Sequence, residues 1–208
     1  MARGFDWIAP YYDFLARLAF GKNIRRCQLE YLDKIPSGGN VLILGGGTGW
    51  ILTELFKVNP TCRVLYVEAS VKMLEKAKTR NDVLPSSQVI FIHGTERNLK
   101  QIADVRFDTV ITNFYFDLFT STSLRAVLEN ITRSINPGSK LLVSEFVGRS
   151  RWQQLLLFVM YHFFKWTCSI EASRLPDWQG ELKRHGFTER DTKMFCNGFM
   201  KSSLYVFD

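Results

Sequence analysis

An apolar stretch, Val41-Leu42-Ile43-Leu44, runs directly into the glycine-rich turn Gly45-Gly46-Gly47-Thr48-Gly49. Four successive apolar residues are typical of a strand with both faces covered, as in a parallel sheet flanked by helices. Glycines let the backbone approach a ligand closely, and a helix that begins after the turn offers free N–H groups to an anionic group. The stretch therefore predicts the first strand, turn and helix of a ligand-binding α/β domain.

The alternation of apolar runs and helical patterns continues along the chain. Four further apolar runs predict strands over 64–67, 89–92, 109–111 and 140–144. Apolar residues at helical spacing predict helices over 50–57, 71–79 and 121–134, and a weaker one over 99–103. This order of strands and helices is that of a doubly wound parallel sheet.

Both ends of the chain differ from this central pattern. Residues 5–35 have helical spacing, are interrupted near Gly21 and end at the breaker Pro36-Ser37-Gly38-Gly39. In the C-terminal third, the segment 149–166 has the length of a helix and is rich in large apolar residues. Two closing runs flank Asn197-Gly198, which is a hairpin signal.

Together these elements predict one α/β domain over residues 1–208, with a Rossmann-like, doubly wound, seven-strand sheet. An antiparallel C-terminal hairpin completes the sheet. A helical cap over residues 1–36 precedes it, and an insertion over 147–175 forms a helical lid. A chain of 208 residues and 24.1 kDa is long enough to bury such a core.

The composition argues against several classes of protein. Apolar residues make up 46% and charged residues 23% of the chain, which excludes a disordered or coiled-coil protein. The net charge is +7, but no basic stripe with interleaved aromatic residues occurs, which argues against nucleic acid as a partner. The longest apolar run, 155–161, is far shorter than the ~20 residues of a membrane span. Contact with a membrane is therefore at most peripheral.

The cysteines and the N-terminal segment bear on the compartment. The four cysteines lie far apart without a C-x-x-C pair, which predicts reduced thiols and no metal site. Asp6 and Asp13 interrupt the opening segment, so it lacks the apolar core of a secretion signal. We expect a cytoplasmic protein.

An acidic residue follows the glycine turn at the spacing of a nucleoside site. Glu68 ends the second predicted strand, about 20 residues after the turn, where a carboxylate can accept hydrogen bonds from both ribose hydroxyls. A dinucleotide fingerprint counted from Gly45 or Gly47 would place its last glycine at Trp50 or Leu52. Bulky residues there oppose the close helix–strand packing of that mode, and no G-K-[ST] sequence marks a P-loop. The spacing therefore predicts a nucleoside bound in another way.

This first motif resembles that of the class I S-adenosylmethionine-dependent methyltransferases, a strand followed by G-x-G-x-G. Three later segments are similar to further signatures of that family, and they are Val67 to Ala77, Phe107 to Asn113, and Asn136 to Leu142. The opening, Phe5 to Asp13, is similar to the start of the ubiquinone/menaquinone-biosynthesis C-methyltransferases and their small-molecule relatives. The resemblance covers nearly the whole chain.

The resemblance implies S-adenosylmethionine as cofactor, S-adenosylhomocysteine as product and a small, apolar or aromatic methyl acceptor. It places the glycine turn at the methionyl part, Glu68 at the ribose and Tyr12 over the methionine end. Ala69 and Met73 flank the adenine. The cofactor-binding residues that it implies are Tyr12, Gly45, Gly46, Gly47, Thr48, Gly49, Glu68, Ala69, Met73, Thr95, Glu96, Asn113 and Phe114.

Two positions depart from the family pattern. Many relatives carry an acid where Ile43 stands, and many carry an adenine-binding aspartate where Thr95 stands. Glu96, next to Thr95, is a candidate to accept the hydrogen bond of the adenine amino group instead. These departures leave open a non-catalytic S-adenosylmethionine-binding protein. An aminopropyltransferase, whose glycine turn is similar, and a nicotinamide-dependent oxidoreductase are weaker alternatives.

The catalytic residue is not fixed by the sequence, since transfer from a sulfonium depends chiefly on alignment and exclusion of water. Three side chains are candidates. His162 lies in the lid, where an imidazole can act as general base or can be a structural residue. Tyr115 follows the fourth strand, and both Tyr115 and Asp117 are candidates to orient the acceptor or to take its proton. Exposure at the surface explains Asp117 equally well.

The aromatic block 152–166 admits three interpretations: core packing, a lid over an apolar substrate, or a helix that rests on lipid. Apolar positions surround much of this helix rather than one face of it. This favours a lid or a protein-contact surface, and it leaves a homodimer open.

Overall fold

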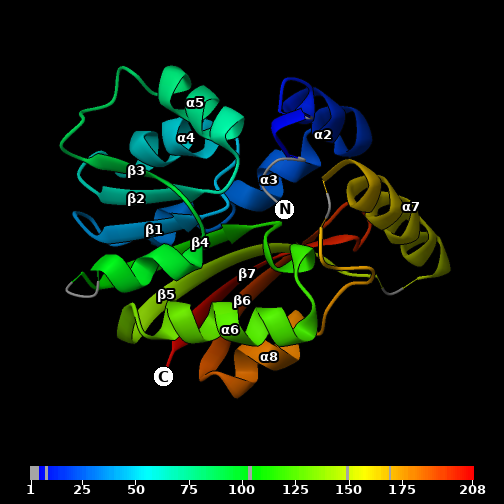
Figure 1. Cartoon of the computed structure of the whole chain (residues 1–208). Coiled ribbons are helices and arrows are strands. Elements are labelled where there is room, and N and C mark those ends of the chain that lie inside the picture. The colour runs from blue at the N-terminus through cyan, green and yellow to red at the C-terminus, as the bar shows by residue number, and fades with distance from the viewer. Residues whose placement is uncertain (1–4, 8, 103–104, 149, 169) are drawn as a thin grey trace.

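The computed structural model describes residues 5–7, 9–102, 105–148, 150–168 and 170–208. Its seven-stranded sheet has the order β3-β2-β1-β4-β5-β7-β6 (Figure 1). The first five strands are parallel, and β7 runs antiparallel between β5 and β6. The strands are β1 (Asn40–Leu44), β2 (Arg63–Glu68), β3 (Val89–His93), β4 (Phe107–Asn113), β5 (Ile135–Phe146), β6 (Phe187–Phe195) and β7 (Met200–Phe207).

Helices cover both faces of the sheet, which confirms the doubly wound prediction. Figure 1 shows α4 and α5 on one face and α6 and α8 on the other. The α-helices are α2 (Tyr12–Phe20), α3 (Asn23–Leu29), α4 (Trp50–Val58), α5 (Val71–Arg80), α6 (Ser121–Thr132), α7 (Arg151–Cys168) and α8 (Trp178–Arg184). The short 3-10 helices are η1 (Leu32–Lys34), η2 (Glu96–Ile102) and η3 (Phe116–Leu118).

The two faces of the central strand β1 explain why its sequence is apolar throughout. Val41 and Ile43 belong to a buried cluster with Leu55 of α4. Leu42 belongs to a second cluster with Leu128 of α6. Because successive side chains of a strand point to opposite faces, each residue of β1 enters one of two cores.

Local signals set where the elements begin and turn. The side chains of Ser70, Thr120 and Asp177 each accept a hydrogen bond from the backbone amide three residues on, and so begin α5, α6 and α8. At the closing hairpin, Asn197 and Gly198 have φ angles of 52° and 80°. This left-handed backbone is what the Asn-Gly dipeptide favours.

Two predicted elements differ in form. The weak helix expected over 99–103 is the 3-10 helix η2, which begins earlier, at Glu96. The turn expected at Pro137-Gly138 interrupts β5 instead of preceding it, because β5 already pairs with β4 at Ile135. Gly138 has a φ of 88° at this irregularity, a conformation that glycine permits.

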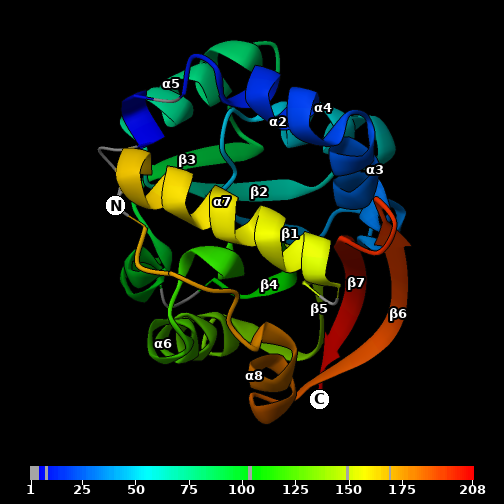
Figure 2. The same ribbon diagram turned by 90° about the vertical axis from the view of Figure 1, so that its right-hand side faces the viewer.

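A third apolar cluster lies at the carboxyl edge of the parallel strands. Helix α7 crosses this edge near α2 (Figure 2). Leu157 and Tyr161 of α7 belong to the same cluster as Phe146 of β5 and Phe199 of the hairpin turn. Within the described ranges, no helix has the length and apolar character needed to cross a bilayer. Helices α2 and α7, which belong to the segments expected to form the cap and the lid, thus lie over this edge of the sheet.

Candidate active site

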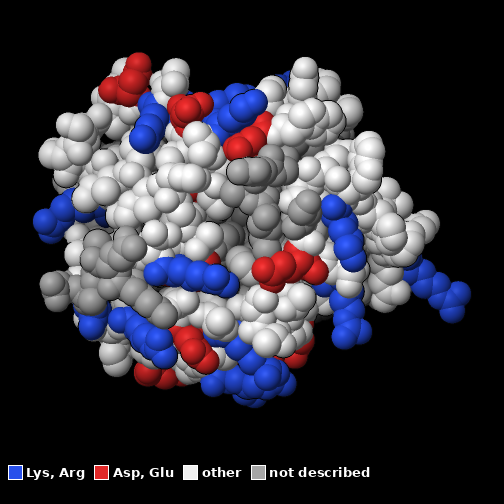
Figure 3. Space-filling view, viewed as in Figure 1, with Lys and Arg blue, Asp and Glu red and all other residues white. Residues whose placement is uncertain are grey.

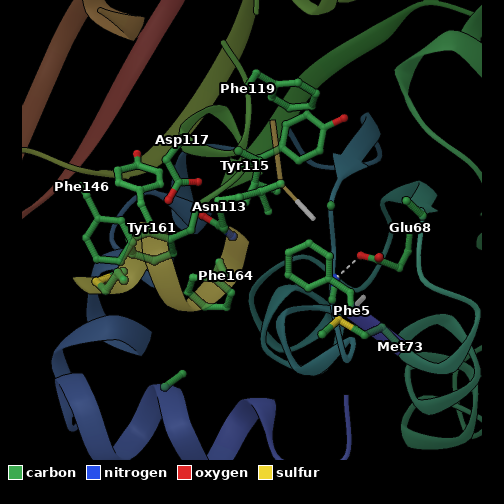
Figure 4. Close-up of a pocket in the computed structure, with 18 of the residues that line it drawn as sticks. Phe5, Glu68, Met73, Asn113, Tyr115, Asp117, Phe119, Phe146, Tyr161 and Phe164 are labelled. Carbon is green, nitrogen blue, oxygen red and sulfur yellow. Dashed lines mark hydrogen bonds between the residues drawn. The ribbon is translucent and has the colours of Figure 1, made fainter. Parts of the chain in front are cut away.

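A cavity of about 600 Å³ opens between the carboxyl edge of the sheet and the segments that cover it. Open α/β sheets bind their ligands at this edge. Figure 4 shows Glu68 and Met73 toward one end of the cavity, and Asp117 and Tyr161 toward the other. The residues between them come from the end of β4, so one space connects a polar end with a largely apolar one.

The glycine turn forms part of the wall at the polar end. Gly45 and Gly47 have φ angles of 63° and 64°, which side-chain-bearing residues rarely adopt. A Cβ added at Gly46 would lie 2.1 Å from Cζ of Tyr66, so only glycine fits there. A Cβ added at Gly47 would meet no atom within 4 Å. The backbone at Gly47 therefore faces open space, and this cradle fits the methionyl part of the expected cofactor.

Glu68 links this turn to the end of β2. Its Oε2 accepts a hydrogen bond from the Gly47 amide and its Oε1 accepts one from the Ser70 amide, each at 2.8 Å. Burial raises the pKa of the Glu68 carboxyl above its usual value, although these amide hydrogen bonds lower it. Each carboxylate oxygen has a second lone pair. Because Glu68 also lines the cavity, it fits a pair of ribose hydroxyls.

Glu96 and Tyr115 form a buried pair in the same wall. The Tyr115 hydroxyl donates a hydrogen bond to Glu96 Oε2 at 2.9 Å. Burial raises the pKa of the Tyr115 hydroxyl well above its usual value. This hydroxyl is thus a donor committed to Glu96, and the geometry gives no support to Tyr115 as a proton acceptor. That Tyr115 orients the acceptor stays a prediction.

The end of β4 separates the two ends of the cavity, and Asn113 and Phe114 line it there. Phe114 has a φ of 51°, although it is not glycine. Its amide donates to the Ser144 carbonyl at 2.7 Å, and its ring centroid lies 4.6 Å from that of Phe146. Backbone held in such a conformation by its surroundings is typical of ligand sites.

A polar cluster fixes the N-terminal segment over the glycine turn. The Thr48 hydroxyl donates to Asp13 of α2 at 2.8 Å. Arg80 of α5 pairs with Asp13 at 2.8 Å and donates to Thr48 at 2.9 Å. Nearer the N-terminus, Asp6 accepts a hydrogen bond from the Ser70 hydroxyl at 2.6 Å. The cap is therefore tied to the two loops that hold Gly47 and Glu68.

Most of the predicted cofactor residues come together around the cavity. Those that line it are Gly45, Gly47, Glu68, Ala69, Met73, Thr95, Glu96, Asn113 and Phe114. Gly46 and Thr48 line a smaller adjoining cleft instead. Gly49 lines neither space, because it packs against Ala77 of α5. A Cβ added at Gly49 would lie only 2.6 Å from the Cβ of Ala77. The side chain of Tyr12 falls outside the described residues, so its contact with the cofactor stays a prediction.

His162 lies away from the cavity, which corrects its interpretation as a general base. Tyr161 of α7 faces the cavity, and the next residue of a helix is turned by about 100°. His162 is consequently exposed, and its Nδ1 lies 2.8 Å from the Phe158 carbonyl oxygen. Its ring lies over the Phe158 ring, with centroids 4.0 Å apart.

Asp117 is buried and lines the cavity, so its interpretation as an ordinary surface acid is wrong. Glu145, at the end of β5, is also buried, and the sequence analysis missed it. The sequence held one signal for Glu145, because this acidic residue continues the apolar run of a covered strand. Tyr161 and Asp13 were missed as well, and no local pattern marks either.

Comparison with known proteins agrees with this geometry. Residues 41–138 match a family model described as a methyltransferase domain. The ubiquinone/menaquinone biosynthesis C-methyltransferase UbiE of Pseudomonas fluorescens (strain Pf0-1) is 33% identical over 152 residues, which are 70% of this chain and 57% of that protein. The chain therefore spans less than two thirds of the length of this relative.

Solved structures share the fold. A SAM-dependent methyltransferase from Aquifex aeolicus has a TM-score of 0.63 at 16% identity, over 88% of this chain and 93% of that one. The mitomycin 7-O-methyltransferase MmcR has a TM-score of 0.68 at 13% identity, over 98% of this chain and 60% of that one. At these identities the likeness concerns the fold alone.

The sheet order, the matched family model and the relatives agree on one class of protein. Together they support a class I S-adenosylmethionine-dependent methyltransferase. S-adenosylmethionine is the cofactor of that class. Within it, the chain is similar to ubiquinone/menaquinone biosynthesis C-methyltransferases, the group that the opening segment resembles.

Proposed function

We propose that the protein transfers the methyl group of S-adenosylmethionine to a small, neutral, apolar or aromatic acceptor. One observation carries the proposal. A single cavity joins the end formed by the glycine turn and Glu68 to an end formed by α7 and the carboxyl terminus of β5. A cofactor at the first end would present its methyl group to an acceptor at the second.

The cofactor roles that we propose follow from position in the cavity. The open space at Gly47 receives the methionyl part, and Glu68 accepts hydrogen bonds from the ribose hydroxyls. Met73 and Ala69 flank the adenine, and Glu96 lies at its edge. The support is that all five residues line the cavity.

The charges of the wall support a cationic cofactor and a neutral acceptor. The charged residues that line the cavity are Glu68, Glu96, Arg97, Asp117 and Glu171. A mostly acidic wall attracts a cationic group such as a sulfonium and disfavours an anionic acceptor. On the face in Figure 3, basic side chains lie among acidic ones and form no continuous stripe, which supports a small molecule over nucleic acid.

The far end of the cavity supports an apolar acceptor. Phe146, Leu157 and Met160 line it. Apolar surface continues outside on the two covering helices, where Leu18 of α2 and Trp166 of α7 are exposed. About 600 Å³ lies within the range of small-molecule sites, and the cofactor would take part of it. The acceptor is therefore a small molecule.

When bound, S-adenosylmethionine supplies a methyl group that its sulfonium sulfur already activates. The chain then has to hold the acceptor in line with that group and keep water out. Helix α7 and the cap cover the cavity on the side away from the sheet. In this proposal, residues 147–175 act as a lid and residues 1–36 as a cap.

The test measures formation of S-adenosylhomocysteine by mass spectrometry, with S-adenosylmethionine and a panel of phenols and quinols. We expect at least one apolar acceptor to raise its formation above the acceptor-free rate. The Glu68→Ala protein should lose this activity, and the Glu75→Ala protein, changed at an exposed residue of α5, should keep it. Binding of S-adenosylmethionine without turnover of any acceptor would favour the non-catalytic alternative.

We also propose a cytoplasmic location. All four cysteines of the chain are free thiols in the structure, which fits a reducing compartment. A homodimer stays a prediction, and sedimentation velocity would test it.

A further inference from the structure

Three buried polar atoms near the apolar end of the cavity have no hydrogen-bond partner among the described residues. They are Oδ1 of Asp117, Oε2 of Glu145 and the hydroxyl oxygen of Tyr161. Asp117 is 8% exposed, Tyr161 is 6% exposed and Glu145 is fully buried. Because nearly all buried polar groups in proteins are hydrogen-bonded, three unpaired ones together indicate a partner that binds there.

The two carboxyl groups have different positions. Glu145 Oε1 accepts hydrogen bonds from the amides of Tyr115 at 2.8 Å and Phe116 at 2.6 Å, so it holds the first turn of η3. Glu145 does not line the cavity. Asp117, which follows Phe116 in η3, does line it. Glu145 is thus a positioning residue, and Asp117 is the carboxyl group that a ligand can reach.

The surroundings make this carboxyl group a proton acceptor near neutral pH. Burial raises the pKa of Asp117 to about 7. Burial, and next the charge of Asp117, raise the pKa of Glu145 well above its usual value. Tyr161 of α7 is the third titratable group here, and burial raises its pKa as well. Two carboxyl groups in apolar surroundings resist ionising together, so a negative charge on Asp117 favours a protonated Glu145.

Figure 4 shows Asp117 beside Tyr161, on the side of the cavity away from Glu68. Both side chains line the space that the proposed function gives to the acceptor. The remaining lining of this end is largely apolar, with Phe146 and Met160 among it. A ligand there can meet the Asp117 carboxyl group and the Tyr161 hydroxyl within a largely apolar wall.

We propose that Asp117 binds and deprotonates the methyl acceptor, and that this acceptor is a neutral apolar molecule carrying a hydroxyl group, such as a phenol. The inference rests on the proposed methyl transfer. The acceptor hydroxyl donates to Asp117 Oδ1, and the Tyr161 hydroxyl donates to the acceptor oxygen. A protonated amine is disfavoured, because it would lie close to a sulfonium of like charge and has no lone pair for the methyl group.

The balance of the step agrees with this placement. The acceptor oxygen forms a bond to the methyl carbon as the carbon–sulfur bond breaks, and the electron pair of that bond stays on sulfur. The proton of the acceptor hydroxyl passes to Asp117. A cation and an anion thereby become a neutral thioether and a neutral carboxylic acid, a change that apolar surroundings favour.

The test is isothermal titration of protein saturated with S-adenosylhomocysteine, at about pH 8, where Asp117 is ionised. The probes are 2-naphthol, whose hydroxyl group can donate a hydrogen bond, and 2-methoxynaphthalene, whose methoxy group cannot. We expect the wild-type protein to bind 2-naphthol about tenfold more tightly, since a hydrogen bond to a charged group is involved. This preference should shrink as the pH falls below about 7 and the carboxyl group takes up a proton.

Three variants complete the experiment. Asp117→Leu, close in size but without an acceptor, should bind both probes equally. Asp117→Asn keeps the shape should the leucine variant fail to fold, and it should lose most of the preference. Asp82→Asn, at an exposed loop residue, is the matched control and should behave as the wild type.

The possible failures are distinguishable. If the wild-type protein does not bind S-adenosylhomocysteine, the proposed function fails and the inference fails with it. If that ligand binds but both Asp117 variants keep the full preference for 2-naphthol, the inference alone is overturned. Tighter binding of 2-naphthylmethylamine than of 2-naphthol would also overturn it, because the site would then recognise an ammonium group.

Discussion

The glycines of the turn between β1 and α4 have different roles at the residue scale. Gly46 lies against the Tyr66 ring, whereas Gly47 faces the cavity. We expect Gly46→Ala to lower the melting temperature strongly, because its Cβ would overlap a buried ring. Gly47→Ala should cost only about 1–2 kcal/mol for its positive φ, yet weaken cofactor binding. Thermal unfolding and titration with S-adenosylhomocysteine measure both. Equal effects of the two substitutions on stability and on affinity would contradict this distinction.

Glu68 gives a second prediction at this scale. In Glu68→Gln, one carboxylate oxygen becomes an NH2 group, so the hydrogen bond from either the Gly47 amide or the Ser70 amide loses its acceptor. We expect affinity for S-adenosylhomocysteine to fall about tenfold or more. The Glu75→Gln protein serves as the control, and unchanged affinity in Glu68→Gln would show that Glu68 does not contact the ligand.

His162 gives a negative prediction. Because this side chain is exposed on the outer face of α7, His162→Ala should leave the rate of S-adenosylhomocysteine formation within about twofold of the wild type. A loss of tenfold or more, without a loss of folded protein, would return His162 to the active site.

At the residue scale, the sequence was informative where the signal is local. The glycine turn and Glu68 could be predicted, because tight turns and strand-end acids have fixed spacings. The burial of Asp117 and the engagement of Thr48 by Asp13 could not, because both depend on contacts between segments that lie far apart in the sequence.

At the scale of elements, the cap should depend on its polar anchor. Asp13 joins α2 to the glycine turn through Thr48 and to α5 through Arg80. We expect Asp13→Asn to speed hydrogen exchange in α2 and to weaken binding of S-adenosylhomocysteine, since the cap would cover the cavity less of the time. Hydrogen exchange followed by mass spectrometry provides the measurement.

The control for this prediction is Asp33→Asn, which removes an exposed acid paired with Lys34. It should leave exchange in α2 unchanged. Slow exchange in α2 of the Asp13→Asn protein, equal to that of the wild type, would mean that packing alone holds the cap.

The elements themselves were largely predictable, and the faces of α7 were not. Apolar periodicity and turn signals placed the strands and most helices within a few residues, because those signals are local. The block 152–166 is apolar nearly all round, so its sequence does not say which side is covered. In the structure, Leu157 and Tyr161 are buried while Phe158 and Trp166 are exposed. Which residues of α7 are buried is therefore decided by tertiary packing and not by the spacing of its apolar residues.

At the scale of the whole molecule, buried carboxyl groups should make stability depend on pH. The pKa of Asp117 is about 7 in the fold against an ordinary value of 3.8. Between these values the folded protein keeps a proton that the unfolded chain releases, so the free energy of unfolding falls as pH rises from about 4 to about 7. The pKa values of Glu68 and Glu145 shift in the same direction.

The measurement is the melting temperature at about pH 5 and about pH 8. The wild-type protein should melt at a lower temperature at the higher pH, and Asp117→Asn should reduce this difference by several degrees. Glu181 and Glu189 have lowered pKa values, so the stability that they contribute is lost only as pH falls below their ordinary value. An equal pH effect in both proteins would mean that Asp117 does not titrate as its surroundings indicate.

A crystal structure with S-adenosylhomocysteine tests most directly whether the cavity is a cofactor site. We predict the ribose hydroxyls at Glu68, the homocysteine part along Gly45 and Gly47, and the sulfur atom facing the space beside Asp117. Clear density for the ligand at another place, or an empty cavity at saturating ligand, would contradict the account.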